Sequence, residues 1–192
     1  MFAMSKTAAN NPTMGRYIAF LRGINVGGHK PIKMDALAKA FASLGFQSVK
    51  TVLASGNVLF DAPGTSPGVL TQRIEEKLEK TFDHPVGVTI RTVTEIQKLV
   101  KSDPFKGITV TPQTRLYVTF RRDKTRGGLK IPYQSPEKDF QILSVSAGEV
   151  CCVLTLSPGR QTPQLMNVLE KEFGKTVTTR SWNTILCILK SC

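Results

Sequence analysis

The sequence predicts an α+β fold of two tandem ferredoxin-like domains, each with an antiparallel sheet. Over roughly the first hundred residues, patterns typical of strands and helices follow one another in the order β-α-β-β-α-β-α. The first six elements have the order of the split βαβ motif. Beyond a segment with two prolines, residues 102–112, a shorter series of the same kind follows without an obvious sequence repeat. A length of 192 residues suits one large domain or two small ones.

The elements of the first half follow from the spacing of apolar residues. Short apolar or alternating runs predict strands at residues 16–21, 48–54, 57–60 and 86–90. Apolar residues at steps of three and four predict helices over 34–44, 70–78 and 93–100. Thr92 and Glu95 have the spacing of a capping box before the third helix. A hairpin turn is expected at Ser55-Gly56-Asn57, because glycine and asparagine tolerate a positive φ.

The second half has fewer regular patterns. Strands are predicted at residues 116–120, 140–145 and 150–156, and a long basic loop at 121–138. One helix is predicted to begin with Thr162 as N-cap and Pro163 as its first residue, and a last helix begins near Trp182. The expected organisation is a disordered tail (1–15), an N-terminal ferredoxin-like domain (16–102), a linker (103–112) and a C-terminal α+β ferredoxin-like domain (113–192).

The charge of the chain indicates anionic partners. Lysine and arginine outnumber aspartate and glutamate by 26 to 14, which gives a net charge of +12. Such a charge favours nucleic acid, acidic ligands or anionic surfaces as partners. No apolar run approaches the roughly 20 residues that span a bilayer, so no membrane is expected as a partner. The first 15 residues lack the apolar centre of a secretory signal, and a cytoplasmic location is expected.

The cysteines and histidines form no metal-binding pattern. Cys151 and Cys152 are adjacent, Cys187 and Cys192 lie near the C-terminus, and no C-x-x-C is present. A zinc site needs about four ligands at suitable spacing, so no metal and no cofactor are expected. Reduced thiols that pack within strands and helices are expected instead.

The segment FLRGINVGGHK, residues 20–30, is the first candidate binding site. Gly23 and Gly28 have the spacing of the glycines in a P-loop, but a histidine and Lys30 follow where that motif needs lysine and then serine or threonine. An ATPase of that class is therefore not expected. Backbone N–H groups of the loop and the N-terminus of the following helix can still bind an anion, helped by Arg22 and Lys30. The alternative is that the glycines only let the chain turn sharply.

Two further stretches carry polar or aromatic residues of interest. Ser55 lies in no strand-to-helix elbow and would need a histidine as base, so catalysis by it is not favoured. Asn57 is a candidate polar group beside the glycine loop. Trp182 is the sole tryptophan, and it either fills the core or stacks on a ligand or base beside Arg180.

The motifs LRGINVGG, LGF, SGNV and a terminal TRxWNT together resemble the bacterial family called domain of unknown function 1697, over nearly the whole chain from about residue 14. The resemblance implies tandem ferredoxin-like α+β domains and no assigned biochemical role. The motif residues of the family correspond to Arg22, Gly23, Asn25, Gly27, Gly28, Ser55, Gly56, Asn57, Arg180, Trp182 and Asn183. Members usually carry asparagine at the position of Ser181, which puts a ligand contact by that amide in doubt.

The leading hypothesis for function is the binding of a phosphate-bearing ligand or nucleic acid through the glycine loop and a basic surface. The predicted ligand-binding residues are Arg22, Gly23, Asn25, Gly27, Gly28, Lys30, Ser55, Asn57, Arg180, Trp182 and Asn183. The predicted nucleic-acid-binding residues are Arg121, Arg122, Lys124, Arg126 and Lys130. One alternative is a small-molecule enzyme whose site lies where the glycine loop, Asn57 and Arg180–Trp182 meet. Another is a non-catalytic interaction module that forms a homodimer.

Overall fold

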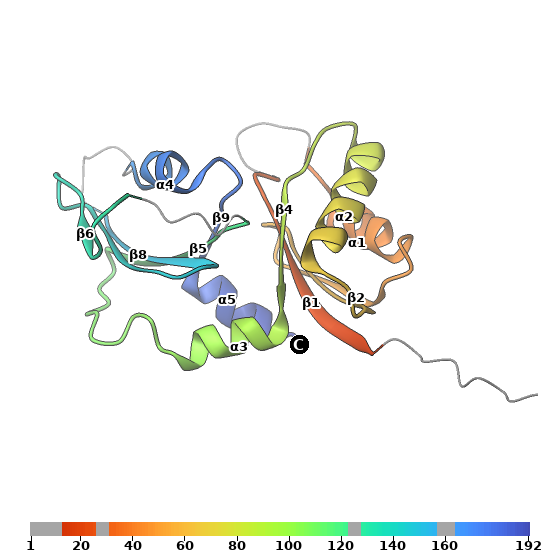
Figure 1. The fold of residues 1–192 in the computed structure, drawn as a ribbon, viewed down its shortest axis with the longest axis horizontal. Coiled ribbons are helices and arrows are strands. Elements are labelled where there is room, and N and C mark those ends of the chain that lie inside the picture. The colour runs from red at the N-terminus through yellow and green to blue at the C-terminus, as the bar shows by residue number, and fades with distance from the viewer. Residues whose placement is uncertain (1–12, 26–30, 123–127, 157–163) are drawn as a thin grey trace, which may run out of the picture.

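The computed structural model describes residues 13–25, 31–122, 128–156 and 164–192. Within these ranges the chain is an α+β protein with two antiparallel sheets and five helices (Figure 1). The mixed class and the antiparallel sheets agree with the prediction. None of the helices in these ranges has the length and apolar character that a bilayer crossing requires.

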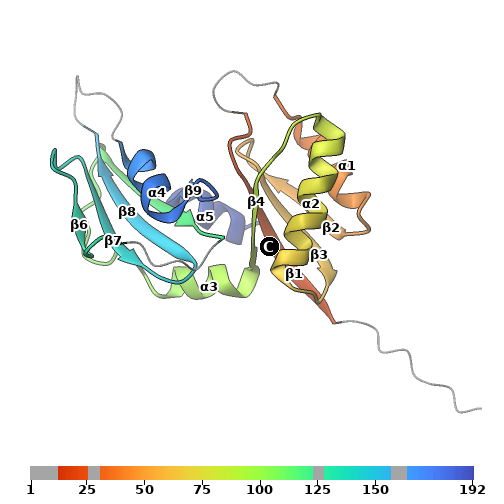
Figure 2. The same ribbon diagram turned by 45° about the horizontal axis from the view of Figure 1, so that its top comes forward.

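The first sheet has four strands in the order β2-β3-β1-β4, and all neighbours are antiparallel. The strands are β1 (Met14–Leu21), β2 (Gln47–Val52), β3 (Asn57–Pro63) and β4 (Val88–Thr92). Two helices, α1 (Met34–Ala42) and α2 (Pro67–Phe82), cover the face that points away from the second sheet (Figure 2). Phe41, Phe46 and Phe60 contact one another in the core beneath these helices.

The second sheet has five strands in the order β6-β7-β8-β5-β9. The strands are β5 (Thr114–Phe120), β6 (Tyr133–Gln134), β7 (Phe140–Val145), β8 (Glu149–Thr155) and β9 (Thr178–Ser181). Helix α4 (Leu165–Phe173) packs on one face through the apolar side chains of Leu165, Leu169 and Phe173. Among the described residues between β5 and β7 there is no helix, so the described part of this half has one covering helix where the first half has two.

A layer of two helices joins the sheets. Helices α3 (Val93–Lys101) and α5 (Trp182–Leu189) contact each other and pack in one apolar cluster with residues of both sheets. At the centre of this cluster the rings of Phe20 and Phe120 stack, with centroids 4.1 Å apart and planes 15° apart. The two halves therefore share one core, to which each contributes a sheet face and a helix.

Several details of the prediction can be compared with these elements. The capping box of Thr92 and Glu95 is confirmed. Strand β9 was not predicted, because its four residues are too few to show an alternating pattern. Cys187 was expected to pack within its helix, which is wrong, since it lies on the exposed side of α5.

The segment between α3 and β5 contains the predicted linker, residues 103–112. Phe105 of this segment is buried, and its ring lies 5.1 Å from the ring of Trp182, edge to face. Trp182 thus packs in the shared core, which is one of the two interpretations of its role. The division into two domains at this linker stays a prediction.

Candidate functional site

Arg180 connects the end of β9 to the first half of the chain. Its Nε donates to Asn57 Oδ1 at 2.6 Å, and a terminal nitrogen donates to the carbonyl oxygens of Leu21 and Gly56 at 2.6 and 3.1 Å. The guanidinium also lies 5.8 Å from the centre of the Phe20 ring. We refer to these five residues as the Arg180 cluster. Only 8% of Arg180 is exposed, so the cluster contains a buried cation whose acceptors are neutral.

The charge state of Arg180 follows from its surroundings. Burial lowers the pKa of Arg180 to about 10, because a charged guanidinium loses hydration inside the protein. The side chain is nevertheless charged at neutral pH. Its hydrogen bonds to carbonyl and amide oxygens compensate for part of the lost hydration.

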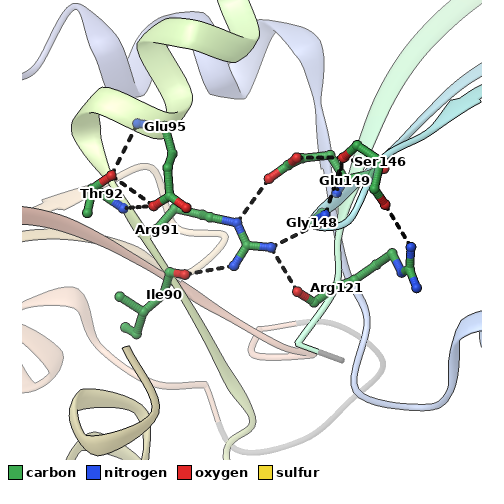
Figure 3. Close-up of polar contacts among 8 residues, drawn as sticks. All are labelled: Ile90, Arg91, Thr92, Glu95, Arg121, Ser146, Gly148 and Glu149. Atoms are coloured by element: carbon green, nitrogen blue, oxygen red, sulfur yellow. Dashed lines mark hydrogen bonds and ion pairs between the residues drawn. The ribbon is translucent and has the colours of Figure 1, made fainter. Parts of the chain in front are cut away.

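Arg91, at the end of β4 in the first half, makes equivalent contacts with residues of the second half (Figure 3). Its Nε donates to Glu149 Oε1 at 3.0 Å, and a terminal nitrogen donates to the carbonyl oxygens of Arg121 and Gly148, both at 2.8 Å. The guanidinium lies 5.6 Å from the centre of the Phe120 ring. We refer to these five residues as the Arg91 cluster.

The two clusters occupy equivalent positions in the two sheets. In the strand registers Phe20 pairs with Asn57, and Phe120 pairs with Glu149. Each arginine also directly precedes the N-cap of a helix, which is Thr92 for α3 and Ser181 for α5. Each half therefore sends one arginine to the strand end and the hairpin turn of the other half.

Two ion pairs also connect the two halves, one from each half to the other. Arg22, just after β1, pairs with Glu170 on α4 at 2.6 Å. Arg122, just after β5, pairs with Glu75 on α2 through both terminal nitrogens, at 2.8 and 3.2 Å. Four arginines thus cross between the halves, and part of the basic character of the sequence serves this internal junction.

A cleft of about 690 Å³ lies beside the Arg91 cluster, between α3, the end of β4 and the turn that joins β7 to β8. Its size is within the range of small-molecule sites. The side chains that could recognise an anion there are basic or carry a hydroxyl group, namely Arg91, Lys98, Arg122, Ser102, Ser144 and Ser146.

The two carboxylates that line this cleft are already engaged. Glu95 accepts hydrogen bonds from the backbone N–H and the hydroxyl of Thr92. Glu149 bonds Arg91 with one oxygen and accepts from the Ser146 hydroxyl with the other, at 2.8 Å. Lys98 is exposed and has no ion-pair partner within the described ranges. Four basic and two acidic residues line the cleft, and Glu75 pairs with one of the basic residues, so the local excess is one positive charge.

The equivalent positions around the Arg180 cluster provide an internal comparison. Leu21 N–H donates to the Gly56 carbonyl and Arg121 N–H donates to the Gly148 carbonyl, so Arg121 is equivalent to Leu21. Val52 pairs with Asn57, and Ser146 N–H donates to the carbonyl of Glu149, so Ser146 is equivalent to Val52. The distance from the helix N-cap equates Lys98 with Cys187. The same junction is therefore built there with less polar side chains, so the fold itself does not require basic and hydroxyl groups at these places.

The sequence profile described as "Protein of unknown function (DUF1697)" matches residues 14–142. The chain belongs to the DUF1697 family. A solved structure, that of a conserved bacterial protein from Streptococcus pneumoniae, has a similar fold with a TM-score of 0.68 and 19% sequence identity. The similarity covers 93% of this chain and 98% of that one, and at this identity it concerns the fold alone. None of the curated proteins matches the chain.

The first DUF1697 motif lies beside a second hollow of about 470 Å³, which Arg22, Gly23, Asn25 and His84 help to line. Asn25 has a φ of 59°. Its side chain accepts from the backbone N–H of Ile32 at 2.7 Å and donates to the carbonyl of the same residue at 3.1 Å. Asn25 thus connects the two ends of the glycine loop. The remaining predicted ligand residues of this loop, Gly27, Gly28 and Lys30, lie outside the described residues.

The second motif supplies the turn that Arg180 contacts. Asn57 is fully buried, and its amide nitrogen donates to the Val52 carbonyl at 2.9 Å and to Ser55 Oγ at 3.0 Å. Asn57 and Arg180 meet, as the enzyme hypothesis requires. Their hydrogen bonds, however, go to each other and to the backbone, which favours a structural role for both.

The last motif begins helix α5. Ser181 is its N-cap, and Ser181 Oγ accepts from the Thr184 N–H at 3.2 Å. Asparagine is an equally good N-cap, so an asparagine, which the resemblance implies at this position, would have the same local role. Asn183 is exposed, and its side chain forms no hydrogen bond within the described part of the chain.

The predicted nucleic-acid-binding residues have different environments. Arg121 is 2% exposed, and its guanidinium donates to the Ser146 carbonyl and lies 4.6 Å from the centre of the Phe173 ring. Arg122 is ion-paired with Glu75, and Lys130 is exposed. The other two, Lys124 and Arg126, lie outside the described residues. Binding of nucleic acid by this set stays a prediction.

The sequence analysis missed the residues that surround the cleft, Arg91, Lys98 and Glu149. A local signal exists for Arg91, because an arginine directly before a capping box lies at the junction of a strand and a helix. The pairing of Arg91 with Glu149 has no local signal, since 58 positions separate the two residues. Among the described residues, no cluster of His, Cys, Asp and Glu could hold a metal ion.

Proposed function

We propose that this DUF1697 protein binds a small, phosphate-bearing anion in the cleft beside the Arg91 cluster. The observation that carries the proposal is the internal comparison of the two junctions. Lys98, Arg121 and Ser146 stand where the other junction has Cys187, Leu21 and Val52. Polar groups that line a cleft at places where the other junction has less polar side chains are typical of a binding site.

The chemistry of the lining supports a phosphate group as the ligand. Guanidinium and ammonium groups form short, charge-assisted hydrogen bonds to phosphate oxygens. Lys98 is exposed on α3, and the hydroxyl groups of Ser102 and Ser144 line the same cleft. A cleft of about 690 Å³ accommodates a ligand the size of a mononucleotide.

A small ligand is favoured over nucleic acid because of how the basic residues are used. Nucleic-acid affinity depends on exposed lysine and arginine side chains that neutralise many phosphates along a surface. Arg121 is buried and Arg122 is ion-paired with Glu75, so the start of the basic segment lines the cleft and the junction.

Titration calorimetry with inorganic pyrophosphate and with AMP tests the proposal. We expect saturable binding by the intact protein and a rise of its melting temperature in excess ligand. In Lys98→Ala the affinity should fall by about tenfold, since the contact between the exposed ammonium group and the phosphate is lost.

The matched control is Lys101→Ala, which removes the same charge from the same helix outside the cleft lining. Its affinity should stay within about twofold of the unmodified protein. Absence of binding to both ligands rejects the proposal. Labelled single-stranded RNA that binds with a steep salt dependence in both lysine variants alike would favour the nucleic-acid alternative.

The proposal includes the architecture and the location of the protein. We take the halves as tandem ferredoxin-like domains, which the strand order β2-β3-β1-β4 and the equivalent contacts of the two sheets support. A cytoplasmic location follows from the expectation that the thiols are reduced. Catalysis is not part of the proposal, and homodimer formation stays a prediction from the sequence.

A further inference from the structure

The two clusters differ in the group that accepts from the arginine Nε. In the Arg180 cluster this group is the neutral amide of Asn57, and in the Arg91 cluster it is the carboxylate of Glu149. We infer that Glu149 is an internal counter-ion of the cleft, which restricts binding to anions that carry two or more negative charges. This inference rests on the proposed function.

The position of Arg91 does not depend on the charge of Glu149. Its terminal nitrogens donate to three backbone carbonyls, those of Ile90, Arg121 and Gly148, each at 2.8 Å. The equivalent Arg180 is positioned in the same way with a neutral Asn57 as the Nε acceptor. The carboxylate therefore adds a negative charge that the junction does not need.

The carboxylate charge of Glu149 lies at the wall of the cleft. Glu149 and Ser146 both line it, and the Glu149 side chain is 21% exposed against 11% for Arg91. A ligand that binds there therefore experiences the attraction of the basic residues together with the repulsion of this carboxylate.

The repulsion acts differently on ligands of different charge. A monoanion that replaces Glu149 at Arg91 exchanges one negative charge for another, so it gains little. A phosphate dianion or a diphosphate retains a second charge, which can interact with Lys98 across the cleft. The ligand class that follows is phosphate monoesters and diphosphates, and not monocarboxylates.

Calorimetry with inorganic pyrophosphate, in the presence and absence of acetate, tests the inference on Glu149→Gln and Glu149→Asn. The first variant keeps the length of the side chain, and the second copies the residue of the Arg180 cluster, so a folded variant is expected in at least one case. Removing the carboxylate should tighten pyrophosphate binding by about tenfold. Acetate should compete in the variants and not in the unmodified protein.

The control is Glu79→Gln, which makes the same change of net charge at an exposed position of α2 outside the cleft. Its affinity should change by less than about twofold. The inference is overturned if both Glu149 variants bind pyrophosphate as tightly as the unmodified protein or more weakly. It is also overturned if the variants differ from the unmodified protein only in a lower stability. Either result leaves the proposed function standing. Absence of binding in every protein, the unmodified one included, rejects the proposed function and the inference with it.

Discussion

Replacing Arg180 with methionine measures how strongly the halves depend on one buried cation. Methionine has a comparable length and no charge, so the change removes the hydrogen bonds of the guanidinium and leaves much of the packing. Three bonds to the other half are lost, those to Asn57, Leu21 and Gly56.

The size of the effect follows from two opposing contributions. Hydrogen bonds from a charged donor each contribute about 1.5–3 kcal/mol, so three contribute about 6 kcal/mol. The pKa of about 10 for Arg180 corresponds to roughly 3 kcal/mol of lost hydration, which methionine does not suffer. Arg180→Met should therefore lower the free energy of unfolding by about 3 kcal/mol, and the melting temperature by about 9 °C.

Urea denaturation, followed by the fluorescence of Trp182 in the shared core, measures this change. The control is Arg115→Met, since Arg115 is exposed and donates only to the nearby carbonyls of Pro112 and Thr114. The control should stay within about 0.5 kcal/mol of the unmodified protein. If the free energy of unfolding falls by less than about 1 kcal/mol in Arg180→Met, the hydrogen bonds of Arg180 only offset the cost of burying its charge, and our reasoning is wrong.

Two further predictions concern packing and pH. Gly56 has a φ of 77°, and an added Cβ would lie 2.6 Å from Ile24 Cδ1. Gly56→Ala should therefore destabilise the fold by about 3 kcal/mol, whereas Gly107→Ala, with a φ of 83° and open space, should cost about 1 kcal/mol. Similar losses in the two alanine variants would contradict the close contact. Burial also raises the pKa of the Cys152 thiol above its ordinary value of 9.0. The buried neutral thiol stabilises the folded state fully below pH 9, and this contribution is lost as the pH rises further. Above pH 9 the free energy of unfolding should therefore fall more steeply in the unmodified protein than in Cys152→Ala, by up to about 1.4 kcal/mol per pH unit. If urea denaturation gives the same pH dependence of stability for the unmodified protein and Cys152→Ala, this prediction is wrong.

The elements that the sequence predicted are those with a local cause. Regular apolar spacing placed α1 and α2, and the capping box of Thr92 and Glu95 placed the start of α3. The short strand β9 has no such pattern, because pairing with β5 determines it.

The candidate site was less predictable for the same reason. The motif residues Asn57 and Arg180 were singled out, but nothing local indicates that one binds the other across 123 positions. Net charge indicated anionic partners without showing that Arg22, Arg91, Arg122 and Arg180 contact the opposite half. Contacts between distant segments decide which basic residues are internal and which can meet a ligand.

The shared core has a consequence for the protein while it is being synthesised. Ile18 and Phe20 of β1 belong to one apolar cluster with Ile185 and Ile188 of α5, a helix that follows both sheets in the chain. On the ribosome the first sheet can form early, but its inner apolar face has no complete cover until the second sheet and α5 have been synthesised. Until then the nascent chain presents an apolar surface that is prone to aggregate, so the final folding of the first half depends on the synthesis of the second.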